Sequence, residues 1–522
     1  MDSHNDSNSQ HTRIAVIGAG IGGISFGIAL KRKFPGSDDI VIYEKGDDVG
    51  GTWRGCASDI SCHFYSLSSD LKADWPTSHP YQPQIYQYWK DLATKYHIYS
   101  HVQFNTLVTS VEWNSKTRYY EIITKDLLSK EEKKSTARIV ISAVGILEVT
   151  KLPEISGISS FKGNIFHSAA WNHEVKLSGK RVAVIGNGAS ATQFVPVISQ
   201  DPSLEVVNFC RTPNWFLWPL RTPYNKLETW LFKHFPFWMR IYRASQFFKT
   251  ELFYFIVFKS ALTRYLFTLI AKLYIKYNAP KKYAKELIPN YTMGCKRVIF
   301  DTNYLASLHQ PNVSLNWDGV ESITEDGIIT KTGKNLPFDV IICATGFVMV
   351  LHFLLVHGPL FIISLDKQDR FPVHVKGTQS TIQEYYDSKS GPAAYMATVV
   401  PGLSQFPNFF MLGGPNATTG HSSVVYTEEN QIEYILKVIT PILKHPDQVH
   451  SIDVTGEATD KYNVKLQADI RHSVFVNCAS YYRTGKDGKV STAWPYSATA
   501  HWWKFRKVKW GDYKVDVVDT QA

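Results

Sequence analysis

The sequence predicts an α/β protein in which a unit of strand, glycine-rich turn and helix occurs twice, with a helical insertion in the second unit. Three observations support this fold class. Residues 13 to 18 form a short, mostly β-branched run that ends in a glycine-rich turn, and residues 24 to 33 after it have helical spacing. Residues 180 to 191 repeat that pattern. Residues 215 to 278 are aromatic, apolar and basic, contain no glycine and have helical periodicity.

The first glycine-rich turn has the residue types that a dinucleotide needs. Gly18 permits a tight turn, Gly20 lets the backbone approach a pyrophosphate, and Gly23 lets the helix pack closely on the strand. The helix N-terminus then presents free N–H groups to the phosphates. A second strand, residues 40 to 43, delivers Glu44 at the spacing of an acid that hydrogen-bonds a ribose hydroxyl. Strand, turn, helix, strand and acid in this order predict a Rossmann-like unit.

The residues after Glu44 indicate which dinucleotide this first unit binds. The run Gly50-Gly51-Thr52-Trp53 resembles the GG motif that follows the FAD ribose contact in flavoproteins with two dinucleotides, so FAD is assigned here. A later glycine-rich turn at residues 413 to 416 leads toward an expected helix at residues 427 to 443, and it suits contact with the flavin ring or its phosphates. The residues expected to bind FAD are Gly18, Gly20, Gly23, Glu44, Gly51, Thr52, Trp53, Tyr65 and Asn416.

The second unit can be assigned from its own residues. It carries Gly186 and Gly188, with Ala191 in the third small position. Its second strand, residues 205 to 210, ends in Arg211 and Thr212 rather than in an acid, and an arginine suits a 2′-phosphate that a carboxylate would repel. The second dinucleotide is therefore expected to be NADPH rather than NADH. The residues expected to bind it are Gly186, Gly188, Ala189, Ser190, Gln193, Arg211 and Thr212. Lys296 and Arg297, further along the chain, are by themselves more typical of a solvated surface pair, and they become candidate cofactor-binding residues only through resemblance to a known family.

Composition narrows the class of protein. A formal net charge of +10 could indicate nucleic acid or an anionic membrane, but two polyanionic dinucleotides also require local positive charge, and no nucleic-acid motif is present. Six scattered cysteines show no CxxC and no metal-ligand spacing, so we expect no metal and a reducing, cytoplasmic compartment. Cys56 and Cys62 lie where some flavoproteins carry a redox pair, but their interval is one residue too long, which favours two ordinary thiols.

The expected domain organisation follows from these units. Residues 1 to 12 are polar, lack a secretory signal and are expected to form a loose tail. Residues 102 to 149 alternate as antiparallel strands. The expected parts are an FAD-binding domain in two pieces (13 to 152 and 370 to 522, with the C-terminal tail), a linker (153 to 179), an NADPH-binding domain in two pieces (180 to 213 and 291 to 347), a helical insertion (214 to 290) and an apolar insertion (348 to 369).

Two apolar segments raise the question of a membrane. Charges interrupt every apolar run in residues 214 to 278, which favours a helical insertion that covers the active site over a membrane-surface patch that collects apolar substrates. Residues 348 to 365 carry no charge apart from two histidines, and Gly358-Pro359 argues against one continuous helix. A buried or re-entrant segment, a membrane span and a translated intron all remain open for this second segment. We favour no membrane contact, with membrane association as the alternative.

The segment between the two units carries the most specific motif. Residues 161 to 171 contain Phe161, Gly163, His167 and Trp171 in the spacing FxGxxxHxxxW. With both turns, this motif resembles the class B flavoprotein monooxygenases, and within them the Baeyer–Villiger monooxygenases, especially fungal enzymes of secondary metabolism such as those of the aflatoxin and sterigmatocystin pathways. The N- and S-oxygenating relatives place Tyr or Phe where this chain has Trp171, so the resemblance favours ketone oxidation.

The resemblance implies an active site and a mechanism. It places the active-site arginine at Arg297 and the aspartate that orients it, which also contacts cofactor, at Asp59. In that family NADPH reduces FAD, O₂ adds to give a C4a-peroxyflavin, and this peroxide converts a ketone to an ester or lactone. The guanidinium supplies a permanent positive charge beside the anionic oxygen. The helical insertion favours a bulky apolar ketone as the substrate.

Other functions stay open from the sequence. A heteroatom oxygenase or a hydroxylase of the same architecture is the nearest alternative, and only product analysis separates it from a ketone oxygenase. A flavoprotein reductase, or a membrane-associated relative that has lost catalysis, belongs to a different class. A reductase would pass electrons from NADPH to an artificial acceptor without oxygenating a substrate.

Overall fold

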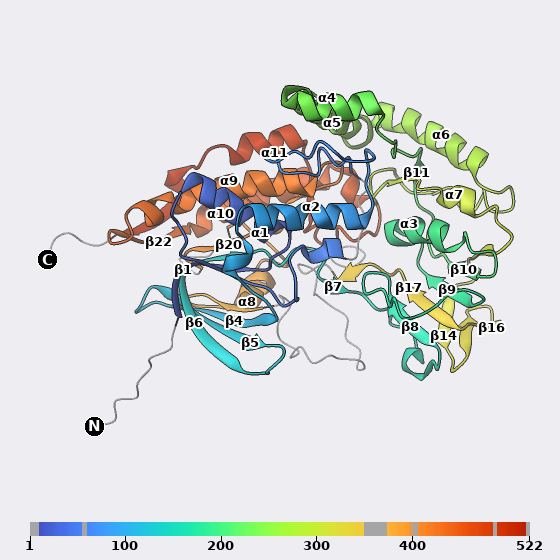
Figure 1. The fold of residues 1–522 in the computed structure, drawn as a ribbon, viewed down its shortest axis with the longest axis horizontal. Coiled ribbons are helices and arrows are strands. Elements are labelled where there is room, and N and C mark those ends of the chain that lie inside the picture. The colour runs from blue at the N-terminus through green and yellow to red at the C-terminus, as the bar shows by residue number, and fades with distance from the viewer. Residues whose placement is uncertain are drawn as a thin grey trace.

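In the computed structural model, the structure describes residues 10 to 54, 60 to 348, 373 to 396, 398 to 399, 406 to 483 and 488 to 517. Two sheets lie side by side in this part of the chain, with helices packed along them (Figure 1). Three features singled out in the sequence, namely Cys56, Asp59 and the apolar segment from residue 349 onward, lie outside the described residues.

The larger sheet has the strand order β19-β4-β5-β6-β1-β2-β3, with β20 also paired to β6. β1 runs parallel to β2 and β6, whereas β5 is antiparallel to β4 and β6, which confirms the antiparallel strands expected within residues 102 to 149. The strands are β1 (Gln10–Ile17), β2 (Ile40–Tyr43), β3 (Val102–Gln103), β4 (Thr106–Asn114), β5 (Tyr119–Asp126), β6 (Glu132–Ser142), β19 (His374–Lys376) and β20 (Phe409–Met411).

Helices from both ends of the chain cover this sheet. α1 (Ile21–Lys33) packs on α9 (Val424–Lys444), so the first and last parts of the chain share one apolar core that includes Phe26, Trp89 and Ile435. Burying such a side chain contributes roughly 2 to 3 kcal/mol relative to exposure. The remaining helices near this sheet are α2 (Gln82–Lys95), α8 (Ile382–Ser388), α10 (Gly456–Arg471) and α11 (Ala498–Phe505).

The smaller sheet is parallel throughout, with the order β13-β10-β9-β17-β8. Its edge strand β8 comes from the segment that the sequence identifies only as a linker. Ile165 and Phe166 of β8 contribute to cores on opposite faces of the sheet, and this alternation explains why the segment adds to the sheet as a strand. The elements are β8 (Asn164–His167), β9 (Arg181–Ile185), α3 (Ala189–Ile198), β10 (Glu205–Phe209), α7 (Tyr304–Ser307), β13 (Val313–Asn316) and β17 (Val340–Cys343).

Five small sheets complete the strands that the structure describes. A three-stranded antiparallel sheet, β14-β15-β16, was not foreseen from the sequence, and its apolar side chains pack against one face of the smaller sheet. The remaining strands form pairs. Their bounds are β14 (Val320–Ile323), β15 (Gly327–Thr330), β16 (Asn335–Pro337), β11 (Phe216–Leu217) with β12 (Ile299–Phe300), β21 (Thr418–Thr419) with β23 (Ala493–Trp494), and β22 (Val449–Val454) with β24 (Tyr513–Val517).

The helical insertion expected from the sequence is present. It comprises α4 (Lys226–His234), α5 (Pro236–Phe253), a π-helical turn η4 (Tyr254–Lys259) and α6 (Ala261–Asn278), and it lies along one margin of the molecule (Figure 1). Within the described residues, no single helix is long and apolar enough to cross a membrane. The bent pair Pro236–Lys259 and Ala261–Asn278, with 102° between its parts, passes that test by length and composition only.

The two sheets are joined by two chain crossings that run side by side. β7 (Val149–Thr150) pairs antiparallel with β18 (Phe347–Val348), and the Lys151 N–H donates to the Gly346 carbonyl over 2.9 Å. The Thr345 hydroxyl donates to the Lys151 carbonyl. The chain therefore leaves the larger sheet and returns to it through one two-stranded connection.

The expected loose tail is shorter than the sequence predicts. β1 begins at Gln10, because Gln10, His11 and Thr12 pair with Ser135, Thr136 and Ala137 of β6. The extension of β6 beyond its apolar part supplies these partners, so the prediction of an unstructured segment through residue 12 is wrong for its last three residues.

Candidate active site

The first glycine-rich turn connects β1 to α1 as the sequence predicts. Gly18 has a φ of +103°, and a Cβ there would lie 2.6 Å from the Ala143 carbonyl oxygen. A Cβ on Gly23 would lie 2.0 Å from the Gly18 oxygen. α1 begins after Gly20 with no side-chain cap and no acidic residue in its first turn, so its N-terminal N–H groups can donate hydrogen bonds to an anion.

Glu44 holds this turn in shape. Its Oε2 accepts from the Ala19 N–H over 2.7 Å, and its Oε1 accepts from the Gly46 N–H over 2.8 Å. The side chain is nearly buried, and a carboxylate with two backbone donors still has lone pairs for a ribose hydroxyl. Glu44 therefore lies at the edge of the turn, where a ribose attached to the pyrophosphate would be bound.

The second glycine pair lies against the first turn. A Cβ on Gly51 would lie 3.0 Å from the Gly20 Cα, so a side chain at either residue would crowd the backbone cradle. The Thr52 hydroxyl faces the Leu147 carbonyl at 3.5 Å. The rings of Trp53 and Tyr65 meet edge to face with centroids 4.8 Å apart. These residues form one contiguous group, and that cradle fits a dinucleotide.

The second turn connects β9 to α3 in the smaller sheet. Gly186 has a φ of +108°, and a Cβ on Gly188 would meet nothing within 4 Å, which leaves open space beside the helix N-terminus. α3 has neither a side-chain cap nor an acid in its first turn. Ala189 is exposed and Ser190 half-buried at this end, and Gln193 is half-buried one turn further along.

The loop after β10 is tied to this second turn. The Asn187 Nδ2 donates to the Thr212 carbonyl over 3.0 Å, and the Asn214 Nδ2 donates to the Asn187 carbonyl over 2.7 Å. These two bonds hold residues 211 to 214 beside the expected phosphate site. The sequence pattern indicates Thr212 but neither asparagine, because an asparagine in a loop is usually only a turn former.

Two cations from distant parts of the chain gather at this loop. Burial and, second, the charge of the Arg211 guanidinium lower the pKa of Lys296. The Lys296 Nζ lies 4.8 Å from the centre of the Tyr291 ring, and the Tyr291 hydroxyl donates to the Pro213 carbonyl over 2.9 Å. Arginine and lysine side chains that meet at one loop can donate charge-assisted hydrogen bonds to a phosphate. The pair suits the 2′-phosphate of NADPH.

Arg297, the next residue, faces the other way. Its Nη1 donates to the Gly420 carbonyl over 3.2 Å, in the C-terminal part of the chain. The side chain is half-buried. Asp59, its expected partner, lies outside the described residues.

Beside Arg297 lies a buried pair that the sequence did not reveal. Burial lowers the pKa of His421, and the charge of Arg297 acts in the same direction. The His421 Nε2 lies 3.6 Å from the Glu251 Oε1. Burial by itself raises the pKa of Glu251, but His421 and the donors of Thr499 and Ala498 outweigh it and bring the pKa to about 2. Glu251 thereby joins the helical insertion to the C-terminal helix α11.

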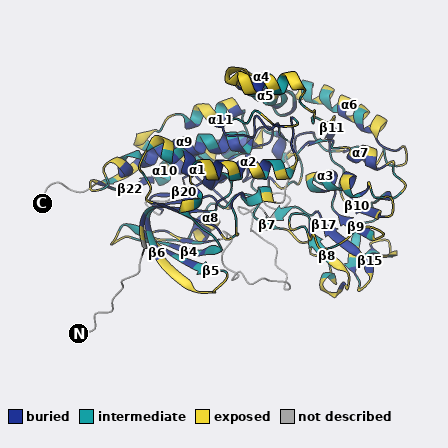
Figure 2. Cartoon of the chain, viewed as in Figure 1, coloured by how far each residue is buried: buried dark blue, intermediate teal, exposed yellow. Residues whose placement is uncertain are grey.

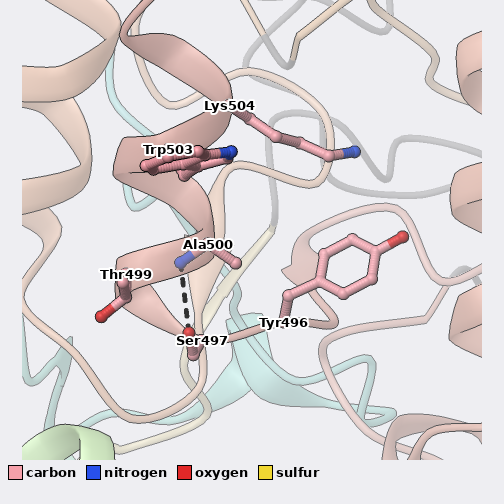
Figure 3. Close-up of a pocket in the computed structure, with 6 residues that line it drawn as sticks. All are labelled: Tyr496, Ser497, Thr499, Ala500, Trp503 and Lys504. Atoms are coloured by element: carbon pink, nitrogen blue, oxygen red, sulfur yellow. Dashed lines mark hydrogen bonds between the residues drawn. The ribbon is translucent and has the colours of Figure 1, made fainter.

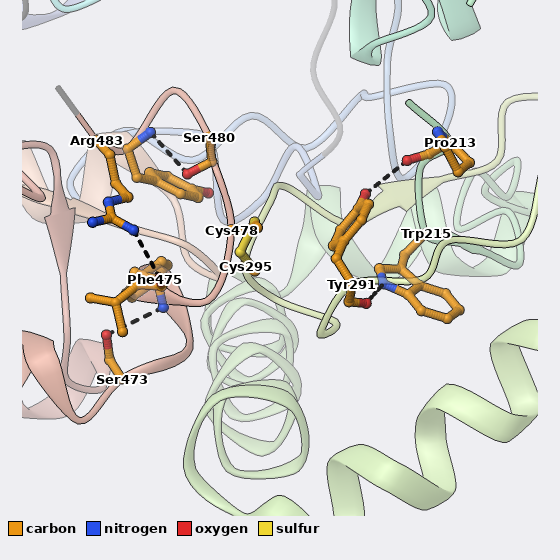
Figure 4. Close-up of a disulfide and its surroundings, with 11 residues drawn as sticks. Pro213, Trp215, Tyr291, Cys295, Ser473, Phe475, Cys478, Ser480 and Arg483 are labelled. Carbon is orange, nitrogen blue, oxygen red and sulfur yellow. Dashed lines mark hydrogen bonds between the residues drawn. A yellow bond between two sulfur atoms is a disulfide. The ribbon is translucent and has the colours of Figure 1, made fainter. Parts of the chain in front are cut away.

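The loop that carries Lys296 and Arg297 is fixed by a disulfide. Cys295 is bonded to Cys478, with their Cα atoms 6.0 Å apart and a sequence separation of 183 (Figure 4). This pair could not be predicted from the sequence, because the two residues are adjacent only in the folded chain. By contrast, burial raises the pKa of the Cys62 thiol to about 12, which agrees with the expectation that Cys62 is not a redox-active thiol.

The linker motif packs at the junction of the two sheets. His167 ends β8, accepts from the Ala169 N–H through Nδ1, and its ring meets Phe347 of β18 with centroids 5.7 Å apart. Trp171 packs edge to face on Phe194 of α3. A Cβ on Gly163 would lie 2.4 Å from the Asp339 carbonyl oxygen. The motif therefore contacts both the chain crossing and the helix of the second glycine turn.

Some expected or visible features lie apart from these residues. The two amide hydrogens of Asn416 are donated to the carbonyls of Val490 and Ala493, so this fully buried side chain stabilises the C-terminal loops and offers no further donor to a flavin. No group of His, Cys, Asp and Glu in the described chain could hold a metal ion. An open depression of about 500 Å³ beside α11 contains none of the predicted site residues; Tyr496, Ser497, Thr499, Ala500, Trp503 and Lys504 line it (Figure 3).

The fold contains two Rossmann-type units, and each has a glycine turn at a helix N-terminus without a side-chain cap. A cationic loop lies between them. These features define an oxidoreductase of the two-dinucleotide class. Similarity to known proteins shows the family within this class of oxidoreductases. The family model described as "Flavin-binding monooxygenase-like" matches residues 11–375, and the chain belongs to this family.

Individual relatives cover most of the chain. A Baeyer-Villiger monooxygenase of Pseudomonas aeruginosa is 30% identical over 95% of this chain and 89% of that protein. The FAD-binding monooxygenase ktnD of Aspergillus niger is 31% identical over 97% of this chain and 82% of that protein. The crystal structure of OTEMO in complex with FAD and NADP superposes with a TM-score of 0.81 at 22% identity, covering 98% of this chain and all of that one, which shows the shared fold.

Proposed function

We propose that this protein is an FAD-dependent monooxygenase that uses NADPH and O₂ to convert a bulky apolar ketone into an ester or lactone, in the synthesis of a secondary metabolite. One observation carries the proposal. Lys296 packs over the ring of Tyr291, whose hydroxyl donates to the Pro213 carbonyl in the loop that carries Arg211, while the adjacent Arg297 donates to the Gly420 carbonyl next to the core of the larger sheet. Two consecutive cations therefore serve two different dinucleotide units.

The residues at the first turn fit FAD, and those at the second fit NADPH. The N–H groups at the start of α1 would bind the pyrophosphate of FAD, and Glu44 would accept from its ribose. When bound, FAD supplies the redox and oxygen chemistry. Arg211 and Lys296 would bind the 2′-phosphate of NADPH as charge-assisted donors, which NADH cannot engage.

Arg297 has the role of holding positive charge where oxygen becomes anionic. A guanidinium stays charged at every working pH, and a half-buried position strengthens its field relative to water. Its hydrogen bond to the Gly420 carbonyl fixes the orientation of the guanidinium. His421, the residue after Gly420, forms a buried pair with Glu251 and would hold this part of the backbone in place. Asp59 is proposed to orient the same guanidinium.

The linker motif is proposed to couple the two units during the reaction. His167 contacts Phe347 in the chain crossing, and Trp171 contacts α3, so a shift of the smaller sheet is transmitted to both. A heteroatom oxygenase remains the second candidate, because the same cation and the same two units would serve it. Trp171 favours ketone oxidation over that alternative by family resemblance.

The decisive experiment uses the purified yellow protein with NADPH and a panel of apolar ketones and sulfides. We expect ketone-stimulated NADPH oxidation and one atom of heavy-isotope oxygen in the ester. Arg297→Ala should still be reduced by NADPH but should release hydrogen peroxide in place of product, with product formation reduced at least about a hundredfold. Arg138→Ala, which removes a guanidinium bound to carbonyl oxygen far from the site, is the matched control. Full ester yield from Arg297→Ala would exclude the proposed role.

We also propose that the protein works in the cytoplasm. If the protein works in the cytoplasm, the reducing conditions there would keep Cys295 and Cys478 largely as thiols, and the disulfide would form only under oxidation. Thiol counting on protein purified under alkylating conditions would distinguish the two states.

A further inference from the structure

The helical insertion turns an apolar surface outward. On α5 and η4 the exposed apolar side chains recur at helical spacing along one line; they are Phe237, Ile241, Phe248, Leu252 and Phe255, exposed by 74, 42, 68, 60 and 53%. On α6 a second line comprises Leu262, Tyr265, Leu266, Leu269, Ile270, Leu273 and Tyr277. We call these two lines together the outer helical face. Figure 2 shows exposed residues along α4, α5 and α6 at the margin of the molecule.

The opposite sides of the same helices are packed into the protein. Ala271 and Ile275 of α6 are fully buried, and Glu251 of α5 caps α11. Because these sides are held by the protein and the helices are bent by 102°, the outer helical face cannot be one side of a straight membrane span. It is an amphipathic surface whose apolar half has no cover within the described chain.

Positive charge surrounds this face, and negative charge is absent from its surface. Every residue from 226 to 278 is described, and the only acids there are Glu228, which caps α4 as part of a capping box, and the buried Glu251. The exposed cations of the same helices are Lys226, Lys233, Arg240, Lys249, Lys259, Lys272 and Lys276. Apolar aromatic side chains with flanking lysines are the pattern of a helix that lies in the interface of an anionic bilayer.

We propose that the outer helical face binds the surface of an anionic lipid bilayer, with α5 and α6 lying flat in the interface. A second copy of the chain suits this face less well, because a two-fold contact would bring the same exposed lysines against one another. The helical insertion adjoins the loop that carries Arg297, since a Cβ on Gly294 would lie 3.0 Å from Val257 and 3.4 Å from Phe258 of η4. Bilayer contact would therefore bring an apolar substrate to the side of the molecule that carries the active site.

The test is co-sedimentation of the FAD-loaded full chain with two kinds of vesicle, one of phosphatidylcholine alone and one with added phosphatidylserine. The wild type should bind the anionic vesicles at least about tenfold more tightly than the neutral ones, and high salt should remove that preference. Phe248→Gln with Leu262→Gln should weaken binding to the anionic vesicles at least about tenfold. Lys249→Glu with Lys272→Glu should remove the preference for the anionic lipid.

Matched controls are available on other surfaces. Leu128 and Val464 are 76 and 72% exposed, lie outside the insertion and can be changed to glutamine in the same way, which should leave vesicle binding unchanged. An unchanged flavin spectrum in every variant establishes that the fold is intact. Absence of vesicle binding by the wild type, or equal binding by the Phe248→Gln and Leu262→Gln variant, would overturn the proposal. So would lipid-free self-association that this variant abolishes, because a second copy would then cover the face. None of these outcomes bears on the proposed oxygenation, which is measured separately with soluble ketones.

Discussion

The protonation state of Glu428 can be tested through the stability of the protein. Its carboxyl lies on α9 beneath the first turn of α1, where a Cβ on Gly22 would be 3.5 Å from its Oε2, and that oxygen has no hydrogen-bond partner among the described residues. Burial raises its pKa from 4.5 to about 8. We predict that Glu428→Gln stabilises the protein above neutral pH, because glutamine keeps the shape without the ionisation.

The magnitude follows from proton linkage. The folded form retains a proton that the unfolded chain releases above pH 4.5, so the free energy of unfolding falls as pH rises from about 4.5 to about 8 and is constant beyond. For this one carboxyl the loss between pH 5 and pH 8 is about 3.5 kcal/mol, taken as an order of magnitude. The variant lacks that loss, and near pH 8 its melting temperature should exceed that of the wild type by roughly 5 °C.

The assay is thermal unfolding of the holoprotein from pH 5 to pH 8, followed by flavin fluorescence. Glu433→Gln, an exposed position on the same helix, should leave the pH slope unchanged. Asp453→Asn should separately reduce the fall in the free energy of unfolding with rising pH, because burial raises the pKa of Asp453 to about 8 as well. If Glu428→Gln unfolds with the same pH slope as the wild type, the carboxyl is ionised in the fold, stabilised by the positive end of α1, and the reasoning fails.

Three further predictions follow from contacts at the site. Gly163→Ala should destabilise the protein by about 1 to 3 kcal/mol in thermal unfolding, because its Cβ would overlap the Asp339 carbonyl, whereas Gly511→Ala, in open space, should be neutral. In the oxidised wild type, a reductant should lower the melting temperature, because the disulfide closes a long loop and contributes up to about 5 kcal/mol. Cys295→Ser should abolish this effect of the reductant. An equal effect in both proteins would argue against the bond. Arg211→Ala should raise the KM for NADPH at least about tenfold and leave the KM for NADH nearly unchanged, and equal changes for both would contradict its assignment.

The local motifs were readable because their chemistry is contained in consecutive residues. A glycine turn needs Gly18, Gly20 and Gly23 at fixed spacing, and β1, the turn and α1 form where the sequence places them. The antiparallel strands β4 to β6 were equally clear from alternation. The segment around Phe166 was harder, because four residues of a strand embedded in a linker give too short a pattern to distinguish it from a loop.

The sequence alone determined two dinucleotide units, their order along the chain, their cofactors and the helical insertion, because each depends on local spacing and residue type. Only the tertiary structure decided which distant residues meet. It brought Lys296 to Arg211, His421 to Glu251 and Cys295 to Cys478, and it turned the apolar line of α6 away from the core. Periodicity shows that a helix has an apolar side, but only packing against the remainder of the chain decides whether that side is covered.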